Sequence, residues 1–129
     1  MLPVTTITAA VANQVGPTVK LDDVAYLTVQ AKFVYGSGGT NTTAWLQTSL
    51  DNGATWIDIA GFQFTTATAT KVYSLGRTPV TTAYTPTDGT ISANTAKDGI
   101  LGSQYRVKYT TTGTYGGSTT LQVDVVAGR

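Results

Sequence analysis

The 129-residue chain contains no cysteine, no histidine and no glutamate. Without cysteine there is no disulfide framework, no thiolate nucleophile and no zinc-thiolate site. Without histidine there is no side chain whose unperturbed pKa lies near neutrality, and every catalytic triad with an imidazole base is excluded. All seven acidic residues are aspartates, so a pair of catalytic carboxylates must come from a small set.

Charge is also scarce. Charged residues make up 12% of the chain and the formal net charge is +1, whereas about 25% of residues are charged in an average domain. A basic face for duplex nucleic acid is therefore not expected. The apolar runs are short and interrupted by threonine, which predicts no membrane span. Residues 1–11 lack a basic region followed by a continuous apolar stretch, so we expect no signal peptide.

Threonine is abundant, with 27 copies in the chain. Its β-branched side chain is stiff, which disfavours helices and suits pleated strands. Candidate strands recur at intervals of roughly ten residues between glycine-containing turns, and no segment of adequate length has helical periodicity. The sequence therefore predicts an all-β, single-domain antiparallel β-sandwich of about 7–9 strands, with Ig-like and jelly-roll topologies both open.

Alternating apolar and polar residues mark the clearest strands. Residues 24–35 and 43–50 flank a glycine-rich loop, which predicts one hairpin. Residues 105–110 and 121–126 flank another glycine-rich turn, which predicts a second. The pattern weakens between Gly76 and Asn94, where prolines indicate a long loop or an edge ribbon.

The domain organisation has one open alternative at the amino terminus. Residues 1–20 alternate threonine with apolar residues and have no strong turn before Gly16-Pro17. They are predicted to form either an arm that adds to a neighbouring subunit's sheet or an ordinary first strand. Residues 21–129 are predicted to form the sandwich domain.

The sharpest motif is the segment 49–56, SLDNGATW. It resembles the Asp box, S-x-D-x-G-x-T-W, a hairpin motif that repeats around sialidase propellers and also occurs singly in other β proteins. An aspartate can accept backbone N–H bonds across such a turn, glycine supplies the backbone angle, and tryptophan packs beneath the hairpin. The motif predicts a structural hairpin with no catalytic role, formed by Ser49, Asp51, Gly53, Thr55 and Trp56.

Three other kinds of site are considered: a pair of catalytic carboxylates, a calcium site and an aromatic surface that stacks on sugars. Two carboxylate pairs are considered for glycoside hydrolysis, Asp51 with Asp58 across the hairpin and the adjacent Asp22 and Asp23, but sequence spacing does not show the separation that catalysis needs. Asp51, Asp88 and Asp98 lie in glycine-containing turns, yet no calcium-binding run surrounds them. No catalytic, cofactor or metal residue is therefore predicted.

Aromatic side chains are the last candidates, as a platform on which sugars stack. A core role is expected for Tyr26, Phe33, Tyr35, Trp45 and Trp56, and exposure for Tyr73, Tyr84 and Tyr115.

Beyond the Asp box, the chain resembles small structural proteins of tailed-bacteriophage particles. The segments that carry this resemblance are 27–33, 47–64, 85–89 and 98–112. It implies a non-enzymatic β-sandwich subunit located in the virion and made in the host cytoplasm. The subunit is expected to oligomerise with its own copies and to bind the major capsid protein or other virion proteins. A capsid decoration or cement role comes first. The alternatives are a neck or tail component, and a β-sandwich module that binds carbohydrate or a cell surface.

Overall fold

The computed structural model describes all residues, 1–129, and is built from strands without a helix. It therefore contains no helix long and apolar enough to cross a membrane. Eight strands have five residues or more, within the predicted 7–9, and three further strands have two. The strands are β1 (Leu2–Thr6), β2 (Val11–Val15), β3 (Val19–Lys20), β4 (Tyr26–Val34), β5 (Ser37–Gly38), β6 (Asn41–Ser49), β7 (Ile57–Phe64), β8 (Ala69–Gly76), β9 (Gln104–Thr112), β10 (Tyr115–Gly116) and β11 (Thr120–Gly128).

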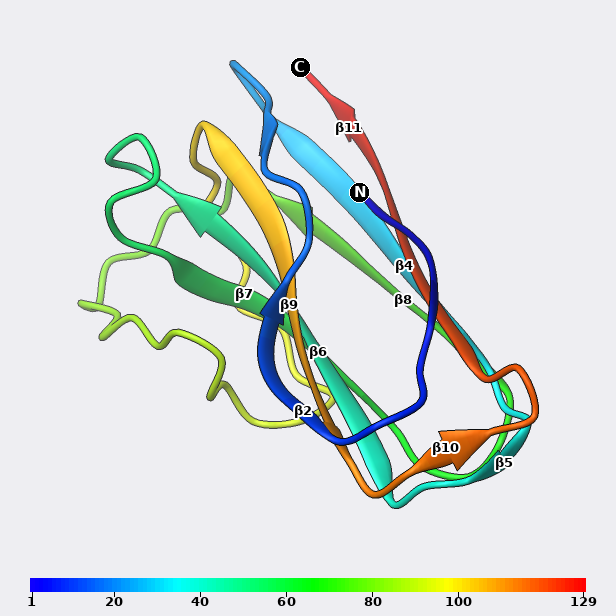
Figure 1. The fold of residues 1–129 in the computed structure, drawn as a ribbon. Helices are drawn as coiled ribbons and strands as arrows, with labels where there is room; N and C mark the ends of the chain where they lie inside the picture. The colour runs from blue at the N-terminus through cyan, green and yellow to red at the C-terminus, as the bar shows by residue number, and fades with distance from the viewer.

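These strands form two antiparallel sheets that pack face to face (Figure 1). The first sheet has the order β1-β11-β4-β8, and the second has the order β2-β9-β6-β7, with β3 added beside β9. The strands β5 and β10 pair with each other. The segment that crosses from β4 to β6 therefore lies beside the segment that crosses from β9 to β11. The predicted β-sandwich is confirmed.

The topology is that of a jelly roll, which resolves the alternative left open by the sequence. Among the eight longer strands, the first pairs with the eighth, the second with the seventh, the third with the sixth and the fourth with the fifth. An antiparallel ribbon rolled in this way places its tip at the turn between β6 and β7. That turn is the Asp-box segment, 49–56.

Both hairpins predicted from glycine-rich loops are wrong. The strand β4 lies in the first sheet and β6 in the second, and the same division separates β11 from β9. Each glycine-rich segment carries the chain from one layer to the other, through β5 in one case and β10 in the other. Strand alternation was predicted correctly, but the neighbour of each strand was not.

The core lies between the sheets and contains 20 buried apolar residues. Phe33 on β4 stacks on Phe64 of β7 with ring centroids 5.1 Å apart, which joins the two layers. Two aromatic predictions are wrong. Tyr115 is 2% exposed and meets Phe33 edge to face, whereas Tyr26 is 51% exposed on the outer side of β4.

The amino-terminal segment, 1–20, contributes edge strands to both sheets of its own subunit. The strand β1 pairs with β11, and β2 and β3 pair with β9. The register of β1 and of β2 shifts once along each strand, between Leu2 and Thr5 and between Val11 and Gln14. Irregular pairing of this kind is common in edge strands.

A long connection, residues 77–103, runs from β8 to β9 along the free edge of β7. The Asp58 and Gly61 amides donate to Thr87 O and Thr95 O, and the Lys97 amide donates to Ile59 O. This is the loop or edge ribbon expected after Gly76. It occupies the hydrogen-bonding edge of β7 and folds over the outer side of the second sheet (Figure 1).

Candidate functional site

The Asp-box turn joins two strands that pair directly, β6 and β7. Asp51 Oδ1 accepts from the Thr55 amide at 2.7 Å and from Ser49 Oγ at 2.9 Å, and Ser49 Oγ accepts from the Gly53 amide at 2.8 Å. Hydrogen bonds from Thr55 and Ser49 lower the pKa of Asp51. Gly53 has φ = 91°, which only glycine adopts without strain. These side-chain hydrogen bonds of Ser49 and Asp51 are internal to the turn, whereas the Ser103 amide and the Gln104 side chain reach it from outside by donating to Ser49 O and Asn52 Oδ1.

Gly53→Val is expected to lower the free energy of unfolding by about 1–2 kcal/mol or more, because a β-branched residue is strained at positive φ. Asp51→Ala is expected to act in the same direction, because the Thr55 amide and the Ser49 hydroxyl lose their acceptor. Urea unfolding of both variants measures the effect. Ala54→Val, which adds the same side chain one residue later at an exposed position, is the matched control. If both variants unfold like the parent chain, the turn does not depend on these bonds.

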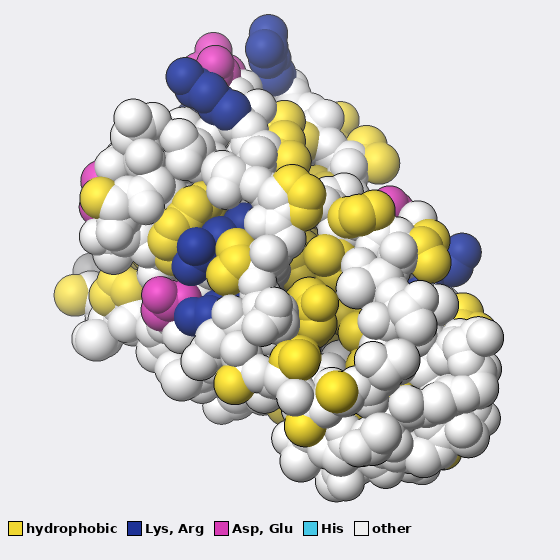
Figure 2. Space-filling view, viewed as in Figure 1, with side chains coloured by type: hydrophobic (Ala, Val, Ile, Leu, Met, Phe, Trp, Pro, Cys, Tyr) yellow, Lys and Arg dark blue, Asp and Glu magenta, His cyan; other side chains and the backbone are white.

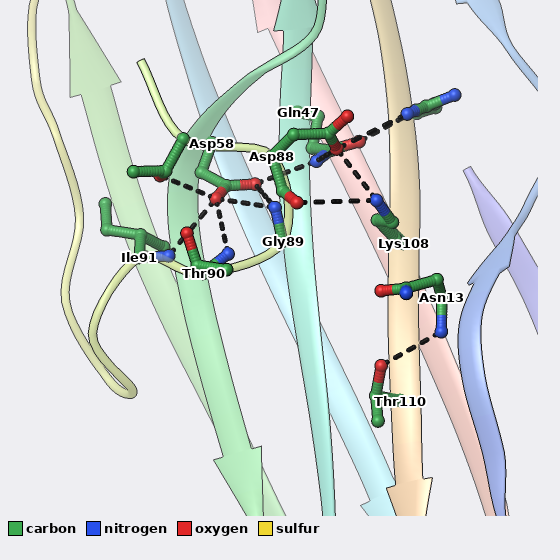
Figure 3. Close-up of polar contacts among 11 residues, drawn as sticks. Asn13, Gln47, Asp58, Asp88, Gly89, Thr90, Ile91, Lys108 and Thr110 are labelled. Carbon is green, nitrogen blue, oxygen red and sulfur yellow. Dashed lines mark hydrogen bonds and ion pairs between the residues drawn. The ribbon is translucent and has the colours of Figure 1, made fainter. Parts of the chain in front are cut away.

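A second polar feature lies on the outer side of the second sheet, under the 77–103 connection. Its centre is the fully buried carboxylate of Asp58 on β7. This carboxylate accepts hydrogen bonds from five donors, drawn in Figure 3. They are the backbone amides of Gly89, Thr90 and Ile91, the Thr87 hydroxyl and the Gln47 side-chain amide.

The loop that binds Asp58 therefore turns around a single negative charge. Three successive backbone amides, from Gly89 to Ile91, converge on the carboxylate at 2.8–3.1 Å. Successive amides in this arrangement form an anion-binding concavity. Here the anion is a side chain of the same chain, so the concavity anchors the loop to β7.

Gln47 connects Asp58 to an ionic group on the surface. Its Nε2 donates to Asp58 Oδ1 at 2.8 Å and to Asp88 Oδ1 at 2.7 Å, while its Oε1 accepts from Arg106 Nε at 2.8 Å. Lys108 Nζ lies 2.9 Å from Asp88 Oδ1. We name these five residues the polar cluster. Figure 2 shows basic side chains beside an acidic one on this face, with apolar side chains around them.

The polar cluster does not present its carboxylates as an acid–base pair. Desolvation raises the pKa of Asp88, but hydrogen bonds from Lys108 and Gln47 and the charges of Lys108 and Arg106 outweigh it, so the net pKa is lowered. Asp88 is thus ionised at neutral pH, whereas a glycosidase acid needs a raised pKa. The partners of Asp51 lie in its own turn, so it shares none with Asp58, and this pair is not assembled.

The three aspartates considered for calcium are likewise separate. Asp51 binds within its turn, Asp88 binds Lys108, and Asp98 accepts from the Gly76 amide and the Thr78 hydroxyl. The structure brings no three acidic side chains together.

Neither tryptophan forms a free stacking surface. Trp45 is buried on β6, and its Nε1 donates to Ile91 O at 3.3 Å. Trp56 is half-buried, and the Arg106 guanidinium lies 4.2 Å from its ring centroid. Tyr73 and Tyr84 are also half-buried, and both hydroxyls donate to backbone oxygens, Gly61 O and Asp58 O.

Sequence reasoning considered Asp58 and Asp88 separately and missed the cluster they form with Gln47, Arg106 and Lys108. A local signal existed, because Asp58 is a charged residue between Ile57 and Ile59 in a strand. That pattern places Asp58 on the outer side of the sheet but does not indicate the loop that covers it. Comparison with known protein families, curated proteins and solved structures found no match for this chain.

Proposed function

We propose that this chain is a non-enzymatic structural protein of a tailed-phage virion, with capsid decoration or cementing as its role and the major capsid lattice as its partner. The jelly-roll topology supports the proposal as an architecture common to viral capsid and lectin domains. Fold alone does not define function.

The observation that carries the proposal is the composition of the exposed strand faces. Long charged side chains are few, and threonine, serine and valine take their place, as on the outer side of β8. Short or β-branched side chains lose little rotamer freedom when a surface is packed against a neighbour. Such a surface suits a subunit that is bound in many copies over an extended lattice.

Carbohydrate binding receives less support from the same structure. Sugar-stacking sites need an open aromatic face, and Arg106 covers Trp56 while Trp45 is buried. Tyr26 is the aromatic residue left broadly exposed, and no other aromatic lies beside it on the outer side of β4.

The test is made on particles produced with and without the gene. Immunogold labelling with antibody against the purified protein is expected on the heads. Heads that lack the protein are expected to release DNA at a lower temperature, and adding the purified protein is expected to restore their stability. Label confined to necks or tails overturns the decoration role. Absence of the protein from purified particles overturns the virion role.

A further inference from the structure

The outer face of the first sheet is a regular surface whose strands alternate exposed and buried residues. The strand β11 pairs with β4 through nine consecutive residues, and β4 pairs with β8 through eight, without a bulge. Regular pairing of this length makes an even platform. The outer side of the second sheet differs, because the 77–103 connection folds over it.

This platform carries half of the chain's exposed large apolar residues, four of eight. They are 49–70% exposed, and the strand alternation places them outward, opposite buried neighbours such as Leu27 and Phe33. The four residues are Tyr26, Val34, Val72 and Val126. We name the outer faces of β4, β8 and β11 the outer platform.

The outer platform has two charges, and they are of opposite sign. Lys32 on β4 lies opposite Gln122, and Asp124 on β11 lies opposite Gln30, so the two are diagonal neighbours on adjacent strands. Diagonal neighbours on paired strands are about 7–8 Å apart. Neither forms a salt bridge within the chain.

We propose that the outer platform binds a second copy of this chain in a two-fold symmetric dimer. The two-fold axis passes midway between Lys32 and Asp124. Lys32 of each copy then lies against Asp124 of the other copy, which forms two equivalent ion pairs. A surface that carries one charge of each sign is thus complementary to itself, as a two-fold interface requires. The apolar residues around the charges supply the buried area.

The size of the platform sets the expected affinity. Three strands of eight or nine residues cover roughly 14 Å by 30 Å, or about 430 Å², against about 800 Å² per partner in a standard interface. The dimer is therefore expected to be weak, with the equilibrium visible between about 1 µM and 1 mM. The inference concerns the purified chain in solution and does not depend on the proposed virion role.

Charge exchange tests the interface. Lys32→Asp places like charges together and is expected to weaken dimerisation at least about tenfold, as is Asp124→Lys. The double variant, Lys32→Asp with Asp124→Lys, restores both pairs and is expected to recover the dimer. Lys97→Asp, on the 77–103 connection, is the matched control. Sedimentation equilibrium measures the association, and thermal melts of dilute samples show that each variant is folded.

Each outcome of the experiment decides the proposal. A parent chain that stays monomeric throughout the range overturns it. A dimer that is insensitive to the single exchanges, or is not recovered by the double exchange, lies on another surface and also overturns it. A trimer or larger ring overturns the two-fold arrangement. Loss in both single variants and recovery in the double variant support it.

Discussion

Asp58→Ala is expected to lower the free energy of unfolding by about 3–5 kcal/mol, because it removes a buried carboxylate and leaves three backbone amides without an acceptor. The backbone amides of residues 89–91 and the Gln47 side chain all donate to this carboxylate. The corresponding fall in melting temperature is about 10–20 °C for a chain of this size. Urea and thermal unfolding measure both quantities.

Two further measurements separate a local effect from general damage. Hydrogen exchange at the amides of residues 89–91 is expected to accelerate more than exchange in β4 or β11, because the loop loses its anchor first. Asp22→Ala removes an exposed carboxylate with no hydrogen-bond partner and is expected to change stability by no more than about 0.5 kcal/mol. An Asp58→Ala protein of parental stability, with these amides still protected, contradicts the anchoring role.

Phe33→Ala is expected to cost about 3–5 kcal/mol, the usual range for removing a fully buried phenylalanine. Phe33 is fully buried, and its ring contacts Phe64 at 5.1 Å and Tyr115 at 5.7 Å between centroids. These partners belong to the second sheet and to β10, so the cavity opens where the layers and a crossover meet. Urea unfolding measures the loss.

Two further variants serve as controls for the Phe33→Ala measurement. Phe33→Leu retains most of the volume and is expected to cost clearly less than the alanine variant. Leu50→Ala truncates an apolar side chain that is 63% exposed in the Asp-box turn and is expected to be nearly neutral. A loss below 1 kcal/mol for Phe33→Ala, in a protein with unchanged cooperativity, contradicts the interlayer role of the ring cluster.

The polar cluster shows where sequence-based reasoning about a site reaches its limit. Gln47, Asp58 and Asp88 are separated by 11 and 30 residues along the chain, and no motif spans them. Each was readable as a surface residue of a strand or a turn. Their association depends on the path of the 77–103 connection, which composition and alternation do not specify. Tyr115 was misjudged for a similar reason, because the glycine-rich turn that contains it folds back over Phe33.

Residue patterns alone were enough to predict the all-β class, the faces of β4, β9 and β11, and the tight turn between β6 and β7. These are local properties: threonine favours extended backbone, alternation separates inner from outer side chains, and Gly53 permits positive φ. Which strands are neighbours, by contrast, became known from the folded chain. A glycine-rich connection suits a hairpin and a crossover between layers equally well. In this chain, rolling the ribbon buries the inward faces of β4 and β6 against each other from opposite sheets, and that burial is a property of the whole fold.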